Sequence, residues 1–315
     1  MTDFALQLQN VTKTYGDFKA VDDISLTVPT GAIVGFLGPN GAGKTTTLRM
    51  ILEIIRPTRG TIVVLGRPSA FEVRDRIGYL PEEKGLYKKM KAWSIVAYFA
   101  SLKGVPRRLA KRRAYELLEK YGLKDFADAR TEALSKGMSQ KVQVLASIAH
   151  DPDLVILDEP FSGLDPVNQG VMEEVIQDLA ARGRTVIFST HVMQHAERIC
   201  RAIVLIDKGR IVFDGSVAEA KRSLPRRVVI ETAEDVGPLL ALSSVISAKP
   251  LPRNGDGALG GAWEIHIRDD ADPEVVLQAC FRAGIHLSRF DHSPPTLHDV
   301  FVHMVGPGAR EAARR

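Results

Sequence analysis

The fold is decided by residues 32–52, which read AIVGFLGPNGAGKTTTLRMIL. The first six residues form a nearly continuous apolar run, which is typical of a strand buried on both faces of a sheet. A glycine-rich stretch follows at 38–43, and beyond Lys44 the apolar residues Leu48, Ile51 and Leu52 have helical spacing. The sequence therefore predicts a strand, a glycine-rich loop and a helix in direct succession.

Residues 38–45 match the phosphate-binding pattern G-x4-G-K-[ST] in the strand-to-helix context that this pattern requires. Small glycines let backbone N–H groups turn toward phosphates, and the start of the helix adds positive potential. We expect Lys44 to contact the outer phosphates and the Thr45 hydroxyl to bind Mg²⁺. The residues expected to surround the phosphates are Gly38, Pro39, Asn40, Gly41, Ala42, Gly43, Lys44, Thr45 and Thr46. A merely tight turn is the alternative interpretation.

A second apolar stretch, LVILDEP at 154–160, places two carboxylates at the carboxyl end of an expected buried strand. In an open parallel sheet, ligands bind at this end of the strands. Asp158 is expected to belong to the Mg²⁺ shell, and Glu159 to polarise the water that attacks a γ-phosphate. The alternative is a helix-capping acid followed by a surface acid.

The pattern along the chain predicts an α/β fold with a parallel sheet. Residues 1–37 alternate short β-rich runs with turns, and strand patterns return at 154–157, 185–188 and 203–206. Helical segments are expected near 167–181 and 192–199. Residues of about 88–150 lack strand alternation, so we expect a helical subdomain there inside a domain spanning 1–222.

A second, smaller domain is expected at 226–306, because a basic helical end meets Pro225 and a new pattern begins. The order is β-α-β-β-α-β, compatible with a ferredoxin-like α+β unit. Its predicted strands are 227–232, 245–249, 262–267 and 285–290, and its helices lie near 235–241 and at 273–283, with a glycine-rich loop at 253–262 and a short helix at 296–305. Residues 307–315 are expected to form a flexible tail.

Composition excludes several classes of protein. The 315 residues are 45% hydrophobic and 25% charged, with a net charge of +4, which fits a globular chain and does not by itself indicate nucleic-acid binding. Cys200 and Cys280 have no metal-like spacing, so we expect a reducing compartment. No signal segment and no run of about 18 apolar residues is present, so any membrane function needs another chain.

Four further motifs occur along the chain. Tyr15, within TKTYG, precedes the phosphate-binding loop, and LSKGM at 134–138, SGLD at 162–165 and His191 within STH follow it in this order. With the two stretches above, this ordered set resembles the nucleotide-binding subunit of an ATP-binding cassette (ABC) transporter over residues 4 to about 222. Lys136 and Met138 stand where the commonest form of the signature loop has glycine and glutamine.

The resemblance implies ATP and Mg²⁺ as cofactors and a dimer of cassettes, homomeric or heteromeric, that sandwiches two ATP molecules. It implies that Lys44, Glu159 and His191 are catalytic, with His191 orienting Glu159. Tyr15 would stack on adenine, Ser135 and Gly137 would cap a helix pointing at the γ-phosphate on the second subunit, and Asp165 would communicate across the interface. Taken singly, Ser135 as an ordinary helix cap, Asp165 as a turn residue and Tyr15 as a packed aromatic remain open.

One motif departs from the family pattern. In IGYLPEE at 77–83, Glu82 occupies the position where the family usually has glutamine. A carboxylate can still bind Mg²⁺, although it adds negative charge beside the phosphates. We therefore expect Glu82 to be a functional replacement in the metal set with Thr45 and Asp158.

The second domain, the Glu82 variant and the ending PTLHDVF at 295–301 resemble the exporter branch of the family, including sodium and drug extrusion ATPases. The expected partner is a separately encoded polytopic membrane subunit, which places the chain at the cytoplasmic face of the membrane, with no nucleic acid. Residues 83–90 and the helices after them correspond to the region that receives this partner. The basic run at 107–113 is interpreted as a solvated helix face. The alternative function is a cassette ATPase acting on ribosomes or DNA.

Overall fold

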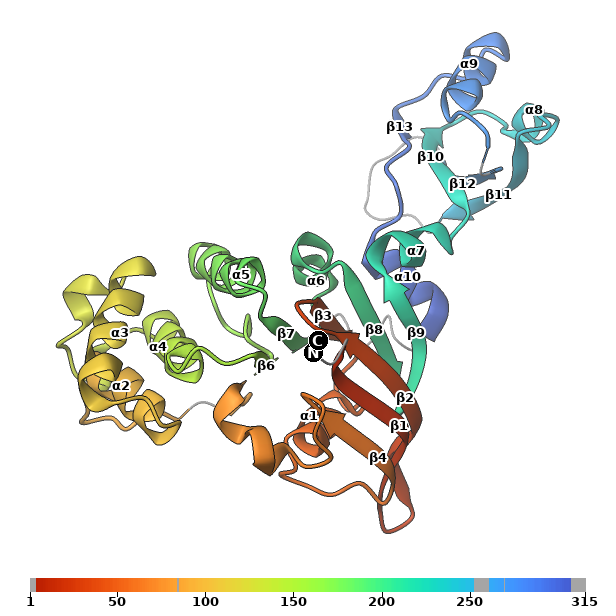
Figure 1. Cartoon of the computed structure of the whole chain (residues 1–315). Helices are drawn as coiled ribbons and strands as arrows, with labels where there is room; N and C mark the ends of the chain where they lie inside the picture. The colour runs from red at the N-terminus through yellow and green to blue at the C-terminus, as the bar shows by residue number, and fades with distance from the viewer. Residues whose placement is uncertain (1–3, 84, 252–260, 269, 307–315) are drawn as a thin grey trace. The chain divides into compact units, whose positions relative to one another are not determined.

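The expected strand, loop and helix at 32–52 are present as β3 (Ile33–Leu37) and α1 (Lys44–Ile51), joined by the glycine-rich loop. The computed structural model describes residues 4–83, 85–251, 261–268 and 270–306. It contains two compact units, residues 1–217 together with 304–315, and residues 218–303 (Figure 1). The predicted tail at 307–315 and most of the predicted loop at 253–262 lie outside the described residues.

A six-stranded sheet organises the first unit. Its order is β5 (Ile77–Leu80), β6 (Leu154–Asp158), β7 (Thr185–Thr190), β3, β8 (Ala202–Asp207) and β9 (Arg210–Ser216). Every residue of β6 and β7 is buried, as their apolar runs predict. The strands predicted at 32–37, 154–157, 185–188 and 203–206 pair in parallel, as expected, and β5 joins them in parallel. β9, which was not predicted, pairs antiparallel with β8. The cause is local: Lys208 and Gly209 both have positive φ and form a two-residue hairpin turn.

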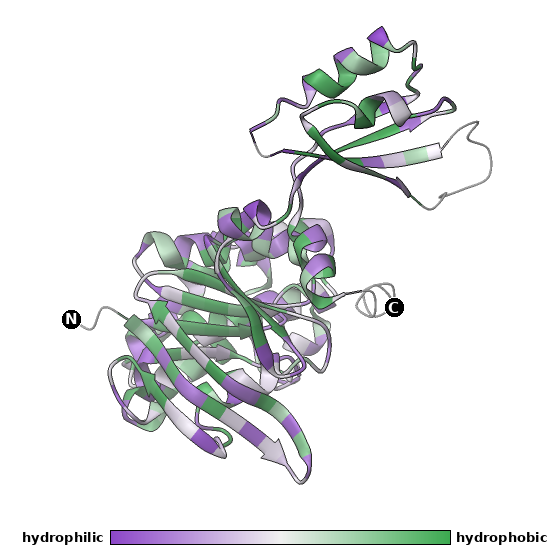
Figure 2. Ribbon diagram, turned by 90° about the vertical axis from the view of Figure 1, so that its right-hand side faces the viewer, coloured by the Kyte–Doolittle hydropathy of each residue, from purple (hydrophilic) through white to green (hydrophobic). Residues whose placement is uncertain are grey.

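A separate antiparallel sheet of order β2-β1-β4 covers part of this unit. Its strands are β1 (Phe4–Tyr15), β2 (Phe18–Pro29) and β4 (Arg59–Val64). Two of the runs predicted as short are therefore strands of 12 residues, and β4 was not predicted. Alternate residues of β2 are buried, and Figure 2 shows this alternation of hydrophobic and hydrophilic residues along the long strands. The sequence analysis detected the alternation but not the second sheet.

The main core lies where the antiparallel sheet, α1 and the six-stranded sheet meet. Leu6 and Leu8 of β1, Phe36 of β3, Leu48 of α1 and Ile187 of β7 belong to one cluster of buried side chains. α5 (Pro166–Ala181) and α6 (Met193–Ile199) also contact β7. Cys200, which follows α6, is buried against Gly35 of β3. The glycine-rich loop is therefore built onto a rigid, fully packed layer.

The region expected to be helical contains α2 (Ala92–Leu102), α3 (Arg107–Lys120) and α4 (Lys136–Ile148), after the short helix η1 (Ala70–Arg76) and β5. Short 3₁₀ turns, η2 (Lys124–Phe126) and η3 (Thr131–Ala133), connect α3 to α4. The three helices contact one another, and α4 also contacts β5 and α5. In the basic run at 107–113, Arg107, Arg108, Lys111 and Arg112 are exposed, as interpreted from sequence.

The second unit has the β-α-β-β-α-β order of a ferredoxin-like fold. Its elements are β10 (Arg226–Thr232), α8 (Gly237–Leu240), β11 (Val245–Leu251), β12 (Gly261–Ile267), α9 (Glu274–Arg282) and β13 (Arg289–Asp291). The strands form an antiparallel sheet of order β11-β12-β10-β13. Cys280 of α9 is buried in its core with Val228 and Ile265. α7 (Val217–Arg222) lies at the start of this unit, before β10, and α10 (Leu297–Val305) follows β13.

The strand predicted at 285–290 is shorter, because only residues 289–291 pair with β10. Side chains satisfy the backbone just before it. The His286 N–H donates to the Glu234 carboxylate at 3.1 Å, and the Thr232 hydroxyl donates to the His286 carbonyl at 2.9 Å. These bonds replace the ladder bonds that a longer strand would make.

Candidate nucleotide-binding and hydrolysis site

The loop between β3 and α1 is closely packed against the chain at two glycines. A Cβ on Gly38 would lie 2.1 Å from the Ile206 carbonyl oxygen, and a Cβ on Gly43 would lie 2.5 Å from that of Ala20. Gly43 also has φ of 104°, a conformation that glycine adopts without strain. These two positions explain why the loop needs glycine. Asn40 and Gly41, at the tip of the loop, are exposed.

Lys44, the first residue of α1, directs its ammonium group into the loop. Nζ donates to the carbonyl oxygens of Gly38 at 2.8 Å and Pro39 at 3.1 Å, and it lies 3.8 Å from Glu159 Oε1. The side chain is 6% exposed, and burial lowers the pKa of Lys44 although nearby carboxylates oppose this shift. A buried cation is thus held among acceptors that a phosphate group can replace.

Asp158 ends β6 beside the start of α1. Its Oδ1 accepts hydrogen bonds from the Thr45 hydroxyl at 3.2 Å and from the Ser189 hydroxyl. The other oxygen, Oδ2, is buried and has no hydrogen-bond partner among the described residues. A buried carboxylate oxygen without a partner is costly unless a cation binds it. Together with the Thr45 hydroxyl it fits Mg²⁺, which takes one or two protein carboxylates and completes its shell with waters and phosphates.

The described residues contain no group of three or more His, Cys, Asp and Glu side chains arranged to hold a metal ion by themselves. Glu82, the third predicted ligand, is exposed just after β5. Burial lowers the pKa of Lys44, and the charge of Glu82 opposes this shift less than the charges of Glu159 and Asp158 do.

Glu159 lies next to Asp158 and faces two partners. Its Oε1 is 3.0 Å from His191 Nδ1 and 3.8 Å from Lys44 Nζ. Glu159 is 7% exposed, whereas the His191 side chain is 47% exposed. The three residues predicted to be catalytic therefore lie together, although 115 positions separate Lys44 from Glu159.

Ser189 is the residue that sequence reasoning did not assign. Its hydroxyl donates to Asp158 Oδ1 and accepts a hydrogen bond from the Glu159 backbone N–H at 3.0 Å. Asp158 and Ser189 are also paired in the register of β6 and β7. One hydroxyl thus fixes both acids. Its position two residues before His191 was the available signal.

The signature residues lie at the start of α4 and the SGLD residues just before α5. Ser135 caps α4 by accepting from the Met138 N–H at 3.2 Å, and Asp165 caps α5 by accepting from the Asn168 N–H at 3.0 Å. The latter bond lowers the pKa of Asp165. Gly137 packs on Asn168, where a Cβ would lie 2.7 Å from Nδ2. Ser135 and Asp165 are exposed, and their hydrogen bonds are those of helix caps.

Tyr15 lies at the end of β1 with half of its surface exposed. The ammonium group of Lys13 lies 5.0 Å from the ring centroid. Tyr15 is therefore not part of the buried core, and its stacking on adenine stays a prediction.

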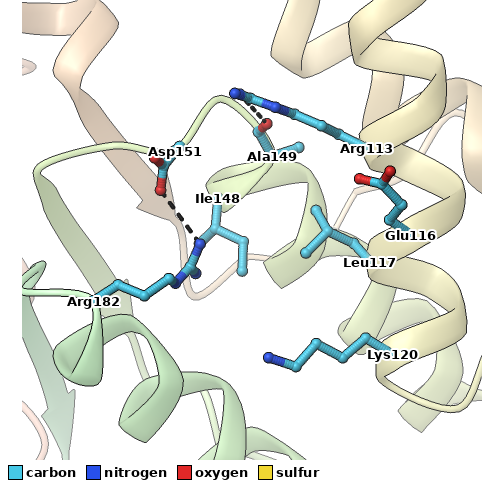
Figure 3. Close-up of a pocket in the computed structure, with 8 residues that line it drawn as sticks. All are labelled: Arg113, Glu116, Leu117, Lys120, Ile148, Ala149, Asp151 and Arg182. Carbon is cyan, nitrogen blue, oxygen red and sulfur yellow. Dashed lines mark hydrogen bonds and ion pairs between the residues drawn. The ribbon is translucent and has the colours of Figure 1, made fainter.

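A separate hollow of about 240 Å³ lies between α3 and the ends of α4 and α5 (Figure 3). Its cations are already paired. Arg113 donates to the Ala149 carbonyl at 3.4 Å, Arg182 lies 3.4 Å from Asp151, and Lys120 lies 2.6 Å from Asp178. They satisfy helix ends and acids, so we assign this hollow a structural role.

Comparison with known proteins places these features in a family. A model of the ABC transporter family matches residues 21–162, and a model of the C-terminal domain of DrrA1-3-like ATP-binding proteins matches residues 215–305. The uncharacterized ABC transporter ATP-binding protein YhaQ of Bacillus subtilis is 39% identical over 303 residues, covering 96% of this chain and 98% of that protein. The chain belongs to the ABC transporter ATP-binding proteins.

Two further similarities bear on the ABC subunit. Nod factor export ATP-binding protein I of Cupriavidus metallidurans is 34% identical over 310 residues, covering 97% of this chain and 99% of that protein. A dimeric post-hydrolysis structure of the ATP-binding cassette MJ0796 bound to ADP and Pi has a TM-score of 0.62 and 25% identity, and covers 67% of this chain and 98% of that one.

As an ABC ATP-binding subunit, the chain binds ATP and is an ATPase that energises transport. ABC subunits of this kind dimerise and work with membrane partners. None of the helices in the described ranges has the length and apolar character needed to cross a bilayer. The relatives named above are transporter proteins, so they do not favour the ribosome or DNA alternative.

Proposed function

We propose that this ABC subunit hydrolyses MgATP to power export through a separately encoded polytopic membrane protein. The observation that carries the proposal is the meeting of Lys44, Glu159 and His191 beside the partnerless oxygen of Asp158. Export is supported by the export ATP-binding protein that matches nearly the whole length of this chain. The second unit is also matched by an ATP-binding protein family.

The phosphate end of the proposed site uses residues of the loop and of β6. The backbone N–H groups of 40–46 and the Lys44 ammonium bind the β- and γ-phosphates, for which Lys44 exchanges its present carbonyl partners. Thr45 and Asp158 hold Mg²⁺, with Glu82 as a third ligand; the bound ion neutralises charge on the phosphates. Tyr15 stacks on the adenine.

The hydrolytic step uses Glu159 as the general base. Its carboxylate accepts a proton from the attacking water as the water oxygen bonds to the γ-phosphorus and the bond to the ADP oxygen breaks. His191 fixes the orientation of Glu159 through the 3.0 Å contact between Nδ1 and Oε1. His191 is half exposed, so its ring is accessible to a bound nucleotide. The products are ADP and phosphate.

The exposed motifs serve the dimer. Ser135 and Asp165 are exposed at the starts of two helices, and Gly137 is buried just behind Ser135. Positive helix ends attract anions. The dimeric structure of MJ0796 supports an arrangement in which two cassettes face each other. The cassette dimer is homomeric or pairs with a related subunit.

The membrane partner docks on exposed aromatic residues of α2 and the segment before it. Tyr87, Tyr98, Phe99 and Leu102 are 57%, 42%, 37% and 61% exposed. The rings of Tyr87 and Tyr98 form an edge-on contact at 6.2 Å, and Tyr98 and Phe99 another at 5.7 Å. A continuous exposed aromatic patch marks a protein interaction surface. The chain therefore works at the cytoplasmic face of the membrane.

The catalytic assignment is tested with Glu159→Gln. We expect the turnover of MgATP to fall about 10²–10⁴-fold, because the amide cannot accept the proton. ATP binding and an ATP-dependent dimer should be retained, as measured by equilibrium binding and size-exclusion chromatography. Glu174→Gln, on the exposed side of α5, is the matched control and should leave turnover unchanged. Full turnover in Glu159→Gln would exclude Glu159 as the base.

The partner assignment is tested by affinity purification from gently solubilised native membranes, with mass spectrometry of the bound proteins. We expect a polytopic membrane protein with the parent chain and its loss with Tyr98→Glu. Phe281→Glu changes a still more exposed ring of the second unit, 74% against 42% for Tyr98, and should keep the partner. Recovery of ribosomes or DNA instead would contradict the export function.

A further inference from the structure

The segment from Glu159 to Asp165, here called the base loop, joins the proposed general base to α5. Glu159 has φ of 49°, in the left-handed region that non-glycine residues rarely occupy. Such a conformation persists only where surrounding contacts hold it. Two turn bonds act within the loop, from the Ser162 N–H to the Glu159 carbonyl at 3.2 Å and from the Leu164 N–H to the Phe161 carbonyl at 3.2 Å.

One side of the base loop is fixed by buried aromatic packing. The Phe161 ring stacks on His195 of α6, with centroids 4.0 Å apart and planes 10° apart. It also makes an edge-on contact with Phe188 of β7 at 5.7 Å. Phe161 and His195 are 3% and 6% exposed. This side belongs to the rigid core of the unit.

The other side of the base loop is held by one face of α4, the helix that carries the signature residues. Gln140 donates its side-chain amide to the Pro160 carbonyl. Lys136 lies over Gly163, where a Cβ would fall 2.6 Å from Nζ and 3.0 Å from Cε. Positions 136 and 140 are one helical turn apart and share a face. Gly137 makes the next contact along the chain, with Asn168 of α5.

We propose that Lys136 is a positioning residue for ATP hydrolysis, which holds the base loop at Gly163 so that Glu159 keeps its geometry. With glycine at position 136, as in the commonest signature loop, no side chain would reach Gly163 from that position. The inference rests on the proposed role of Glu159. The end of the lysine side chain, Nζ and Cε, makes this contact with Gly163. We expect the contact to depend on the length and packing of the side chain rather than on its charge.

The contact gives the signature helix a direct connection to the base of its own chain. α4 holds the base loop at two points, Pro160 and Gly163, so a displacement of α4 moves both points together. The aromatic side stays with β7 and α6. The arrangement of Glu159 therefore depends on where α4 lies, while nucleotide affinity depends on the loop at 38–46. Loss of Lys136 should change kcat rather than KM.

The test uses steady-state hydrolysis of MgATP by the full chain. We expect Lys136→Ala to lower kcat about 5–10-fold with KM for ATP changed less than twofold. Lys136→Met keeps an unbranched side chain over Gly163 without the charge, and should retain more than half of the parent kcat. Lys249→Ala removes an exposed lysine of the second unit and should match the parent. Equal losses for Lys136→Met and Lys136→Ala would overturn the proposal.

A double-mutant cycle with Gly163→Ala tests the contact itself. The added methyl displaces the Lys136 ammonium, so both single changes remove the same contact. The fold decrease in kcat of the double variant should therefore be smaller than the product of the fold decreases of the two single variants. Its decrease in urea midpoint should likewise be smaller than the sum of the two single decreases. Additive effects in both measurements would overturn the proposal. If the parent hydrolyses no ATP, the catalytic assignment fails, while the urea cycle still decides the contact.

Discussion

The proposed ATP site has an interior half, made of Lys44, Asp158 and Glu159, and an outward half, made of Ser135 and Asp165. The two halves differ in whether one chain alone supplies all of their contacts. Lys44, Asp158 and Glu159 are at most 7% exposed, and their contacts join the start of α1, the end of β6 and the end of β7. Ser135 and Asp165 are exposed, and each caps only its own helix. The motifs of both halves are equally clear in the sequence, but those of the first form a buried cluster and those of the second lie at the surface. This difference supports the proposal that one chain assembles its own catalytic residues, whereas the exposed residues act on a second subunit.

The largest effect is expected from Lys44→Ala in the interior half. Turnover of MgATP should fall about 10³-fold or more at every protein concentration, because the buried charge that faces the phosphates is lost. Steady-state hydrolysis between low and high micromolar protein checks this. Lys103→Ala is the matched control, since burial also lowers the pKa of Lys103, which donates to the Arg74 carbonyl. If the turnover of Lys44→Ala recovered at high protein concentration, the interior half would depend on dimerisation as the outward half does, and the distinction between them would be wrong.

Ser189→Ala should have the next largest effect. The Glu159 N–H loses its partner in the interior, which costs about 1–3 kcal/mol, and Asp158 loses one of its two donors. We expect kcat about 10–100-fold lower and a higher Mg²⁺ concentration at half-maximal rate, measured by Mg²⁺ titration. Thr185→Val removes a buried hydroxyl at the other end of β7 and should leave the Mg²⁺ dependence unchanged. An unchanged Mg²⁺ dependence in Ser189→Ala would show that Ser189 does not position Asp158 for Mg²⁺ binding.

The far end of α4 offers a test of stability alone. Burial lowers the pKa of His150 to about 4, so the unfolded chain, with a histidine pKa of about 6.5, binds more protons. The stabilisation is present above pH 6.5 and is lost as the pH falls toward 4. Stability should be about 2 kcal/mol lower at pH 4.5 than at pH 7 from this residue.

The measurement uses urea unfolding in a Trp263→Phe background, where Trp93 alone reports on the first unit. His150→Gln keeps a donor for the Ile77 carbonyl and should remove most of the pH-dependent difference. His286→Gln, at an exposed position of the second unit, should keep it. The same slope in His150→Gln and the parent would contradict the assignment.

The smallest effect is expected from Ser135→Ala at the start of α4. Loss of the cap costs about 1 kcal/mol of helix stability and frays the first turn. Turnover should fall about threefold to tenfold at low protein concentration and recover as the concentration rises, because the outward half acts through the dimer. Ser69→Ala removes the cap of η1 and should lack this concentration dependence. A loss of equal size at all concentrations would move Ser135 to the interior half.

Local patterns predicted most of the interior half. The glycine-rich loop and the Asp158–Glu159 pair follow from short stretches whose strand context is visible in sequence. The role of Ser189 did not follow, because only the register of β6 with β7 places it beside Asp158, 31 positions away. The antiparallel β9 was missed although Lys208 and Gly209 form a turn between two apolar runs. The Lys136 and Gly163 contact depends on how α4 packs, which periodicity does not determine.

Each unit carries one cysteine, and both are buried, Cys200 at 8% and Cys280 at 0% exposure. Burial raises the pKa of both thiols, so neither reacts with a thiol reagent while its unit is closed. The rate at which each sulfur becomes labelled therefore measures how often its own unit opens. The chain thus contains an intrinsic probe of opening in each unit, one cysteine in the ATPase unit and one in the ferredoxin-like unit. Both labelling rates can be measured in the same sample without any substitution.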